Sequence, residues 1–342
     1  MSHKNLNVII KTPKIFRDTL KNKKINNIYK RFEKSLSINE KFAVAVSGGP
    51  DSLALAFLAK AYSIKKKIPS KFLIVDHKLR PESTKEAMAV SRVLKKILVK
   101  SEIITWKGKK PLKNIQSKAR IKRYALLAKN CEKSKIENIL LGHHQDDLFE
   151  NFFIRLSRGS GLKGLISLDK KSKISNKNIL RPLINEKKED LVHISKKVFN
   201  FYIQDPTNLD EKFQRIRIRK LIKELQKDGL DKSKFLKTIK NLKYSNKVVD
   251  FYVRENLKKN TFFSVKKNNL ILNKIFFEQP YEVIFRSFSD SLKIVGKRYY
   301  SVRGKKLDQI INQIEKNHLN KATLGGCVVE KVNQSVIISK EH

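Results

Sequence analysis

The stretch that most constrains the fold of this chain is residues 41–52, KFAVAVSGGPDS. An apolar run, Phe42–Val46, breaks into Ser47-Gly48-Gly49-Pro50-Asp51-Ser52, and the helix-like run Leu53–Leu58 follows at once. The glycines permit a tight turn and a close approach of the backbone to an anion, and Pro50 suits a first helical turn. The free N–H groups at such a helix start favour a phosphate or pyrophosphate group. Because no Gly-Lys-Ser/Thr follows, the pattern predicts a strand, a phosphate-binding loop that is not of the Walker type, and a helix.

Strand-like and helix-like segments alternate through the first half of the chain. We expect strands at Phe42–Val46, Phe72–Asp76, Glu102–Trp106 and Asn138–Leu141, and helices at Asp51–Ile64, Glu82–Val99, Asn114–Cys131 and Asp146–Leu156. This spacing is typical of βαβ units, so we predict an α/β fold built on a doubly wound parallel sheet. A further helix is expected over Lys187–Phe201, and the lysine-rich stretch Lys170–Asn178 is expected to be a mobile loop.

Three distinctive motifs follow predicted strands: the SGGPDS loop, Asp76-His77, and the segment GHHQDDLFE at 142–150. Ligands of parallel sheets bind at the carboxyl ends of the strands, so we expect these motifs to meet at one edge. On a helix, His143, Asp147 and Glu150 would share a face, with His144 and Asp146 beside them. Carboxylates there could bind Mg²⁺ or a substrate ammonium, whereas the spacing is not that of a zinc site. The plainer alternative for each residue is a helix cap or a solvated face.

The chain is strongly basic, with 76 Lys+Arg against 32 Asp+Glu and a formal charge of +44. Such an excess attracts polyanions, although a lysine-rich genome composition could account for part of its size. Arg120 and Arg123, three apart on a predicted helix, could clamp phosphates or form surface ion pairs. The Arg215, Arg217 and Arg219 run is either a polyanion contact or a solvated helical face. Arg158-Gly159-Ser160-Gly161 suits a flexible basic loop.

The length of 342 residues allows two domains. We expect a basic N-terminal extension at 1–40 with one or two short helices, a catalytic domain at 41–214, and a smaller, mainly helical α+β domain at 215–342. In the last of these, strands are expected at Phe262–Val265, Leu270–Leu272, Cys327–Glu330 and Ser335–Ile338, and helices near 280–293 and 303–317.

The two cysteines, Cys131 and Cys327, are far apart and form no Cys-x-x-Cys pair. That pattern speaks against a disulfide framework, a zinc site or an iron–sulfur cluster. The N-terminal residues have no apolar core of signal-peptide length, and the longest apolar run is too short to span a bilayer. We therefore expect a cytoplasmic protein with no membrane partner.

Taken in order, the motifs resemble those of the tRNA(Ile)-lysidine synthases, a family within the PP-loop ATP-pyrophosphatases. The resemblance is dense from about residue 40 to 220. It rests on the SGGPDS loop and on further segments: DHKLRPES at 76–83, ARIKRY at 119–124, GHHQDDLFE at 142–150, RGSGLKGL at 158–165, RPL at 181–183 and DPTN at 205–208. Asn151 and Arg215-Ile216-Arg217 depart from the family pattern, which often has Thr and Asn there. The larger C-terminal domain of longer relatives is expected to be absent.

The resemblance implies an ATP-dependent ligase. ATP would adenylate the C2 oxygen of the wobble cytidine in the CAU anticodon of tRNA(Ile), releasing pyrophosphate, and the side-chain amine of L-lysine would then displace AMP to give lysidine. A related sulfurtransferase, such as a 2-thiocytidine synthetase, is the alternative, but those enzymes need paired or catalytic cysteines.

The resemblance also implies roles for individual residues. The expected ATP-binding residues are Ser47, Gly48, Gly49, Pro50, Asp51, Ser52, Asp76, His77 and Arg120. The expected catalytic residues are Asp51, His143, His144, Asp147 and Glu150, of which Asp51 and Asp147 are also candidate Mg²⁺ ligands. The expected tRNA-binding residues are Arg123, Arg158, Arg215, Arg217 and Arg219.

Overall fold

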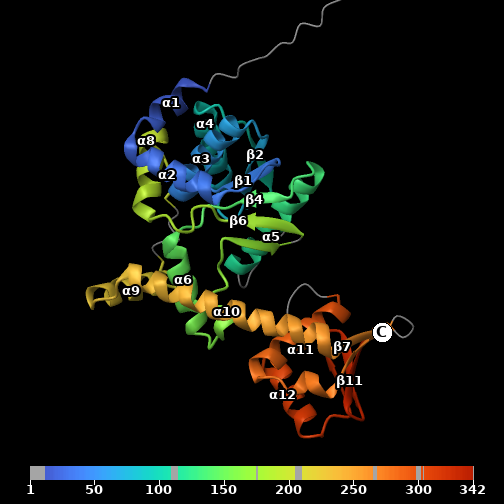
Figure 1. Cartoon of the computed structure of the whole chain (residues 1–342). Coiled ribbons are helices and arrows are strands. Elements are labelled where there is room, and N and C mark those ends of the chain that lie inside the picture. The colour runs from blue at the N-terminus through green and yellow to red at the C-terminus, as the bar shows by residue number, and fades with distance from the viewer. Residues whose placement is uncertain are drawn as a thin grey trace, which may run out of the picture. The chain divides into compact units, whose positions relative to one another are not determined.

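The computed structural model (Figure 1) describes residues 12–108, 115–174, 176–204, 210–264, 268–297, 302 and 304–341. The chain divides into two compact units, residues 1–230 and 231–342. The division falls between Leu230 and Asp231 rather than at 214/215, because helix α9 (Gln214–Lys227) packs against α6 (Gln145–Leu156) of the first unit. The DPTN segment at 205–208 lies outside the described residues.

The first unit is built on a six-stranded sheet. Its strands are β1 (Phe42–Val46), β2 (Ser70–Asp76), β3 (Ser101–Thr105), β4 (Asn138–Leu140), β5 (Lys171–Ile174) and β6 (Lys177–Leu180). They lie in the order β3-β2-β1-β4-β6-β5, and every neighbouring pair is parallel except β5 with β6. The predicted parallel α/β sheet is therefore confirmed, with an antiparallel strand added at one edge.

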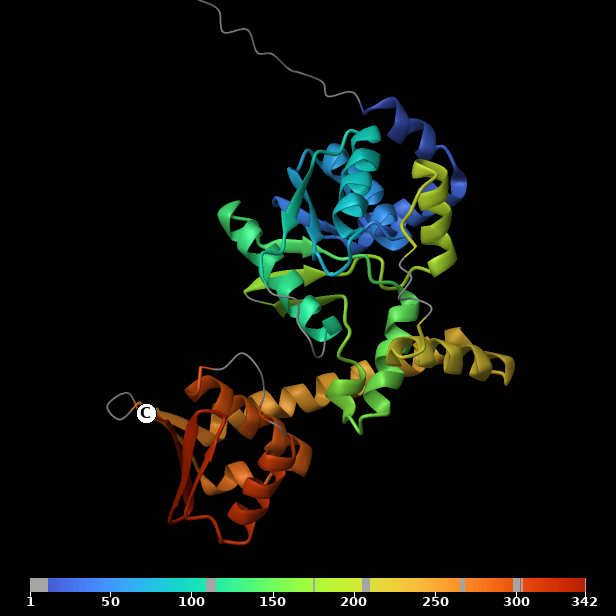
Figure 2. The ribbon, with the colours of Figure 1, turned by 180° about the vertical axis from the view of Figure 1, so that it is seen from behind.

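Helices cover both faces of this sheet (Figure 1 and Figure 2). The helices of the unit are α1 (Lys14–Leu20), α2 (Lys23–Ser35), α3 (Pro50–Lys66), α4 (Ser83–Lys96), α5 (Ile115–Lys133), α6, α7 (Leu162–Leu165), α8 (Lys188–Phe199) and α9. On one face, side chains of α1, α2, α3, α4 and α8 form a core with alternate residues of β1 such as Phe42 and Val44. On the other face, Leu127 and Cys131 of α5 pack against Ala43 and Leu73. This alternation along the strands produces a sheet that is buried on both sides.

Residues 1–40 were expected to be an extension, but the described part of them belongs to the core of the first unit. Phe16, Ile25 and Phe32 are completely buried and join the core that contains α3. The Tyr62 hydroxyl of α3 donates to the carbonyl oxygens of Leu36 and Ile38, each at 2.9 Å. The amphipathic spacing of α2 explains the difference, because one apolar stripe needs a partner surface.

The expectation of a loop at Lys170–Asn178 is wrong, because this stretch forms the β5–β6 hairpin. β6 pairs with β4, and its residue Ile179 is buried. β5 forms the edge of the sheet, and its residues are alternately exposed and half-buried. Lysines are tolerated on an edge strand because its outer side faces water. Lys177, which is buried, forms an ion pair with Glu137 at 2.7 Å.

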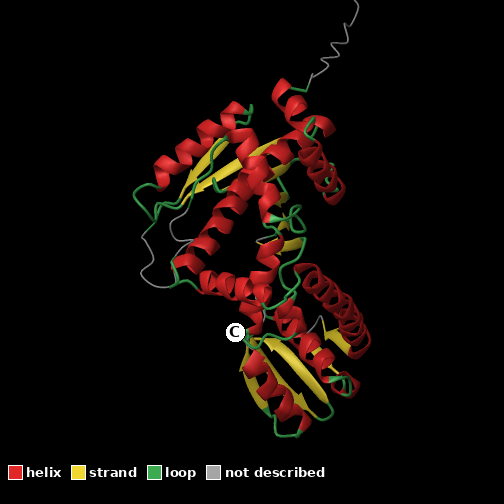
Figure 3. Ribbon diagram, turned by 90° about the vertical axis from the view of Figure 1, so that its left-hand side faces the viewer, coloured by secondary structure: helices red, strands yellow, loops and turns green. Residues whose placement is uncertain are grey.

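The second unit contains a five-stranded antiparallel sheet with helices (Figure 3). Its elements are α10 (Lys232–Asn260), β7 (Thr261–Ser264), β8 (Asn269–Leu272), the 3-10 helix η2 (Lys274–Phe277), α11 (Tyr281–Val295), α12 (Gly304–Glu315), β9 (Lys321–Leu324), β10 (Cys327–Val332) and β11 (Ser335–Lys340). The strand order is β7-β8-β11-β10-β9. Phe288 and Leu292 of α11 and Ile311 of α12 pack against Val329 and Ile338 of the sheet. The predicted strands and helices are present within the described residues, which do not include Val265 or residue 303, and β9 is an additional strand.

The strand order also locates the candidate site. The chain runs outward from β1 through β2 to β3 and then returns to β4, on the other side of β1. Such a reversal, or switch point, is where open α/β sheets bind ligands, at the carboxyl ends of the two central strands. The loop after β1 is SGGPDS and the residues after β4 are Gly142, His143 and His144. Among the described residues, none of the helices combines the length and apolar character needed to pass through a bilayer.

Candidate active site

The loop between β1 and α3 is held open by its own side chains. The Ser52 hydroxyl accepts a hydrogen bond from the Ser47 backbone N–H at 3.1 Å and donates to the Gly49 carbonyl at 2.9 Å. Gly48 has φ +86°, and a Cβ there would lie 2.5 Å from Val90 Cγ2. Gly49 is the N-cap of α3 and supplies no capping side chain. The first N–H groups of α3 are consequently available to an anion.

The end of β4 comes very close to this loop at Gly142. A Cβ on Gly142 would lie 3.0 Å from the carbonyl oxygen of Asp51 and 3.1 Å from the backbone N of Ser52. Only a residue without a side chain allows the two backbones to approach in this way. The contact brings the residues after β4 beside the N-terminus of α3, as expected from the sequence.

Asp51 forms an ion pair with Lys188. The Lys188 Nζ lies 2.8 Å from Oδ1 and 2.6 Å from Oδ2 of Asp51, and Lys188 is the first residue of α8. His144 Nε2 lies 3.6 Å from Asp51 Oδ2. Lys188 is a site residue that the sequence did not reveal, because it stands in the run NEKKEDL beside another lysine.

His144 and Asp147 form the start of α6. His144 is the N-cap, its Nδ1 accepts from the Asp146 backbone N–H at 3.3 Å, and its own N–H donates to Asp147 Oδ2 at 2.9 Å. The side chains of His144 and Asp147 are almost completely buried, and His144 Nε2 lies 3.7 Å from Asp147 Oδ2. His143 precedes the helix, so the expectation that it shares a helical face with Asp147 and Glu150 is wrong. The helix cannot begin earlier because His144 has extended backbone angles.

His143 is held uncharged. Its Nδ1 accepts a hydrogen bond from Arg181 Nε at 3.2 Å, and Arg181 also donates to the Asp169 carbonyl at 2.8 Å. Burial lowers the pKa of His143 to about 3, and the nearby Asp147 carboxylate only partly opposes that effect. The neutral imidazole therefore presents an uncharged ring beside the Asp147 carboxylate at physiological pH.

Glu150 is buried on α6 and paired with two arginines of α9. Arg219 Nε donates to Glu150 Oε1 at 2.5 Å, while Oε2 has longer contacts, 3.4 Å to Arg219 NH2 and 3.6 Å to Arg215 Nε. Burial raises the pKa of Glu150, and the hydrogen bond from Arg219 opposes that shift. Arg215 and Arg219, four residues apart, thus face a carboxylate within the same unit.

Asp76 is occupied by the turn that leads to α4. It accepts hydrogen bonds from the Lys78 backbone N–H at 3.0 Å, Ser83 Oγ at 2.9 Å and Thr84 Oγ1 at 2.7 Å. Burial would raise the pKa of Asp76, but these hydrogen bonds hold it below the usual value. The carboxylate therefore stabilises the turn at the end of β2, where the sequence predicted it to lie. Both of its oxygens already accept hydrogen bonds from this turn.

His77 and Arg123 lie together behind this turn. Burial, reinforced by the Arg123 charge, lowers the pKa of His77 to about 4. Within the described part of the chain, the buried His77 Nδ1 and Arg123 Nε have no hydrogen-bond partner. Arg120 and Arg123 both lie over the Tyr124 ring, 5.1 and 5.6 Å from its centroid. The two guanidinium groups, together with the unpaired Nε of Arg123, form a positive cluster that suits an anionic group.

The remaining predicted arginines, Arg158 and Arg217, are exposed. Arg158 NH2 donates to Gln214 Oε1 at 2.8 Å, and Arg217 NH1 donates to the Glu211 carbonyl at 2.7 Å. Of the two departures from the family pattern, Asn151 donates to Ser167 Oγ at 3.2 Å and Ile216 is buried in the apolar face of α9. Arg217 therefore does not act with Arg215 and Arg219 as one set, although all three are on α9.

The protein supplies only some of the oxygen ligands that a magnesium ion needs. Mg²⁺ prefers oxygen ligands and is often held by one or two carboxylates together with substrate phosphates. Asp51 Oδ2 and Asp147 Oδ2 lie 3.6 and 3.7 Å from His144 Nε2, so both carboxylates border the same imidazole nitrogen. The described residues contain no group of three His, Cys, Asp or Glu side chains that could hold a metal unaided. The two carboxylates fit a magnesium ion that comes with a nucleotide.

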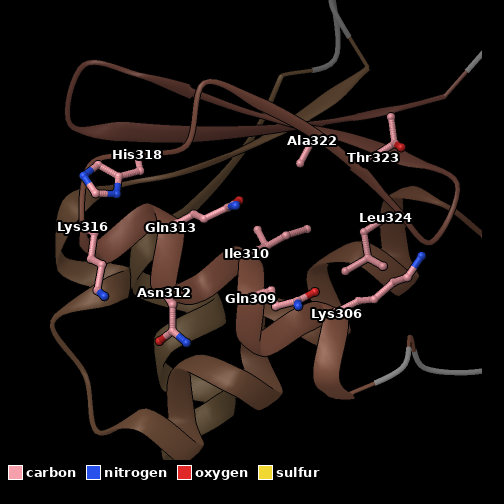
Figure 4. Close-up of a pocket in the computed structure, with 10 residues that line it drawn as sticks. All are labelled: Lys306, Gln309, Ile310, Asn312, Gln313, Lys316, His318, Ala322, Thr323 and Leu324. Carbon is pink, nitrogen blue, oxygen red and sulfur yellow. The ribbon is translucent and has the colours of Figure 1, made fainter.

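A recess of about 550 Å³ belongs to the second unit and contains none of these residues (Figure 4). It is lined along α12 by Lys306, Gln309 and Gln313, just after that helix by Lys316, and on the strand side by Thr323 of β9. The predicted active site instead lies at the switch point of the first sheet.

Comparison with known proteins now identifies the family. Residues 18–225 match the PP-loop domain family. The chain is 34% identical over 312 residues to the tRNA(Ile)-lysidine synthase of a Wolbachia from Brugia malayi, which covers 89% of this chain and 71% of that protein. It is 36% identical over 315 residues to the tRNA(Ile)-lysidine synthase of Orientia tsutsugamushi, covering 89% and 70%. The chain belongs to the tRNA(Ile)-lysidine synthase family.

A solved structure supports the fold of this lysidine synthase family member. The U34-tRNA thiolase NcsA from Methanococcus maripaludis, determined with its [4Fe-4S] cluster, matches with a TM-score of 0.54 at 18% identity, covering 64% of this chain and 78% of that one. At this identity the likeness concerns the fold alone. In the lysidine synthase family member described here, Cys131 and Cys327 are both completely buried and belong to different units. The sulfurtransferase alternative is therefore the less supported one.

Proposed function

We propose that this protein joins L-lysine to C2 of the wobble cytidine in the CAU anticodon of tRNA(Ile), with ATP as the activating substrate. One part of the candidate site has groups that attract anions, and another part has groups that attract cations. The free N–H groups of α3 and the Lys188 ammonium lie beside Asp51, and the buried Asp147 and Glu150 carboxylates follow on α6. The contact of His144 with both Asp51 and Asp147 is the observation that carries the proposal, because it joins the two parts.

In the first step the C2 oxygen of the cytidine attacks the α-phosphorus of ATP, and the bond from that phosphorus to pyrophosphate breaks. The loop of Ser47 to Ser52 holds the phosphates through its backbone N–H groups, and Lys188 balances their charge. Mg²⁺ held by Asp51 and Asp147 would neutralise charge on the leaving pyrophosphate. The positive cluster of Arg120 and Arg123 is suited to a second anionic group, on the nucleotide or the RNA.

In the second step the lysine ε-amine attacks C2, the C–O bond breaks and AMP leaves. The ammonium form of lysine is attracted to Asp147 and to Glu150 Oε2, the oxygen with the longer arginine contacts. The attacking amine must be uncharged, so a neighbouring base accepts its proton. On this proposal Arg215 and Arg219 position Glu150, while the exposed Arg158 and Arg217 contact the RNA backbone.

The test uses purified protein with tRNA(Ile), ATP and labelled lysine, followed by analysis of the released nucleosides. We expect label in a modified cytidine only when ATP is present, with one AMP and one pyrophosphate for each lysine. Incorporation of sulfur, or modification without lysine, would refute the proposal. We assign the activity to the cytoplasm, where tRNA, ATP and free lysine occur together.

A further inference from the structure

Helix α10 exposes large apolar side chains on the face opposite the one that it buries. Ile239, Val253 and Asn256 are buried on one side of the helix. Tyr244, Val248 and Phe251 lie on the opposite side and are 51%, 57% and 52% exposed, with Tyr252 beside them at 53%. The spacings of four and three residues place Tyr244, Val248 and Phe251 on one stripe, and Tyr252 follows Phe251 in the sequence. Contiguous exposed apolar side chains of this kind mark an interaction surface.

The same stripe is basic. The helix contains nine Lys or Arg residues and only two acidic ones, Asp250 and Glu255. Both acids are neutralised, Asp250 by Arg286 at 3.1 Å and Glu255 by Lys259 at 2.9 Å. The Nζ atoms of Lys240 and Lys247 lie 5.6 and 5.7 Å from the centroid of the Tyr244 ring. The charge of the surface therefore suits a polyanion rather than an apolar protein partner.

We propose that this stripe, defined by Lys240, Tyr244, Lys247, Val248 and Phe251, binds unpaired nucleotides of an RNA. Bases that are not in a helix stack on aromatic rings, and lysines beside the rings contact the adjoining phosphates. Every base has a flat π-face that can stack on an aromatic ring, so this contact raises the affinity without selecting a sequence. The identity of the RNA as tRNA rests on the proposed function, whereas the stacking itself does not.

The experiment compares two short RNAs of equal length on the full chain, without ATP or lysine. One is an unstructured RNA of mixed sequence and the other is an abasic strand with the same phosphates. The ratio of their affinities, measured by fluorescence anisotropy, reports the contribution of the bases. The variant Tyr244→Ala/Phe251→Ala should lower the affinity for the normal RNA about tenfold or more for each ring and leave the abasic strand unchanged.

Three further variants sharpen the test. Tyr244→Leu/Phe251→Leu keeps the apolar surface and should lose the preference for bases as well, because stacking needs rings. Lys240→Ala/Lys247→Ala should weaken both strands to a similar degree. Phe262→Ala, which removes a 67% exposed ring on β7, is the matched control and should change neither affinity.

Several outcomes would overturn the inference. It fails if the ring variants keep the preference for bases. It also fails if the leucine variant binds as the parent does. A change in the sedimentation of the protein alone would show that a second copy covers the stripe, and a large drop in melting temperature would show that the stripe packs within the chain. Failure to form lysidine while the base preference disappears in the ring variants would refute the proposed function and leave this inference standing.

Discussion

The ammonium of Lys188 lies within 2.8 Å of both carboxylate oxygens of Asp51, at the N-terminus of α3. The pair brings a residue of α8 onto the SGGPDS loop, although Lys188 lies 137 positions after Asp51 in the sequence. The catalytic consequences of this pair can be tested directly.

Removing either charge should slow the first step. We expect Asp51→Asn and Lys188→Met each to reduce pyrophosphate release by about 10²–10³, since each removes a positioned electrostatic contact. Binding of tRNA should persist, because neither residue is proposed to contact the RNA. Lys187→Met is the matched control, since Lys187 is exposed and next in sequence. Near-normal pyrophosphate release by Asp51→Asn would contradict the assigned role.

Gly142→Ala should damage the site through the backbone. The new Cβ would lie 3.0 Å from the Asp51 carbonyl oxygen, which cannot turn away as a side chain could. We expect a loss of about 1–3 kcal/mol in the free energy of unfolding, as for other overpacked positions, together with weaker ATP binding. Gly161→Ala serves as the control, because no atom lies within 4 Å of its Cβ position. Equal urea midpoints for the two variants would speak against the close approach.

The stability of the first unit should fall in mild acid because of His77. Burial first, and the Arg123 charge second, lower its pKa to about 4, below the ordinary value of 6.5. The unfolded chain then binds a proton that the folded chain does not, so stability is lost as the pH falls from about 6.5 toward 4. The slope from one histidine can reach about 1.4 kcal/mol per pH unit. Urea titrations of His77→Gln should show a shallower slope over this range, and an unchanged slope would exclude His77 as its source.

Arg219→Met should destabilise the protein more than an exposed arginine variant. It leaves the Glu150 carboxylate, which is 2% exposed, without its shortest hydrogen bond. The cost should be on the order of 1–3 kcal/mol, and Glu150→Gln in the same chain should recover part of it. Arg217→Met should be close to neutral, because Arg217 is exposed and donates to the backbone carbonyls of Glu211 and Lys212. If the double variant Arg219→Met/Glu150→Gln is no more stable than Arg219→Met alone, the loss of the Arg219–Glu150 pair does not cause the destabilisation.

Binding of tRNA should depend steeply on salt. If about five phosphates are neutralised, a fourfold rise in salt weakens binding by on the order of 10²–10³. Neutralising Arg158 and Arg217 together should reduce the salt slope by a similar amount for every tRNA, because phosphate contacts carry no sequence information. The measurement is a series of dissociation constants against salt for two unrelated tRNAs. A salt-insensitive complex would mean that the charge of +44 is compositional.

The sequence predicted the central strands and the loops after them because local patterns determine these features. A β-branched run followed by Gly48-Gly49-Pro50 can form little else, and the alternation of strands and helices indicates a parallel sheet. The helical face assumed for His143 was wrong because the start of α6 depends on His144, whose capping role involves a backbone contact to Asp147. Helix patterns do not specify the residue at which a helix begins.

Other parts depended on tertiary contacts that leave no local signal. Lys188 is one of many lysines, and only the packing of α8 against α3 brings it to Asp51. The β5–β6 hairpin is polar because it ends the sheet, so its composition resembles that of a loop. Arg219 was expected to contact RNA, since nothing in α9 indicates that Glu150 faces it.

If ATP binds at this loop as proposed, the Asp51–Lys188 pair makes its phosphates and the Asp51 carboxylate compete for one ammonium. The Lys188 ammonium already donates to both carboxylate oxygens of Asp51, so a phosphate that draws it away must also weaken that ion pair. A triphosphate competes well with a single carboxylate, whereas a monophosphate competes poorly and an uncharged nucleoside hardly at all. On the proposed function the site would then favour ligands in the order of their negative charge, and AMP, the product with fewer charges, would be the one released most readily.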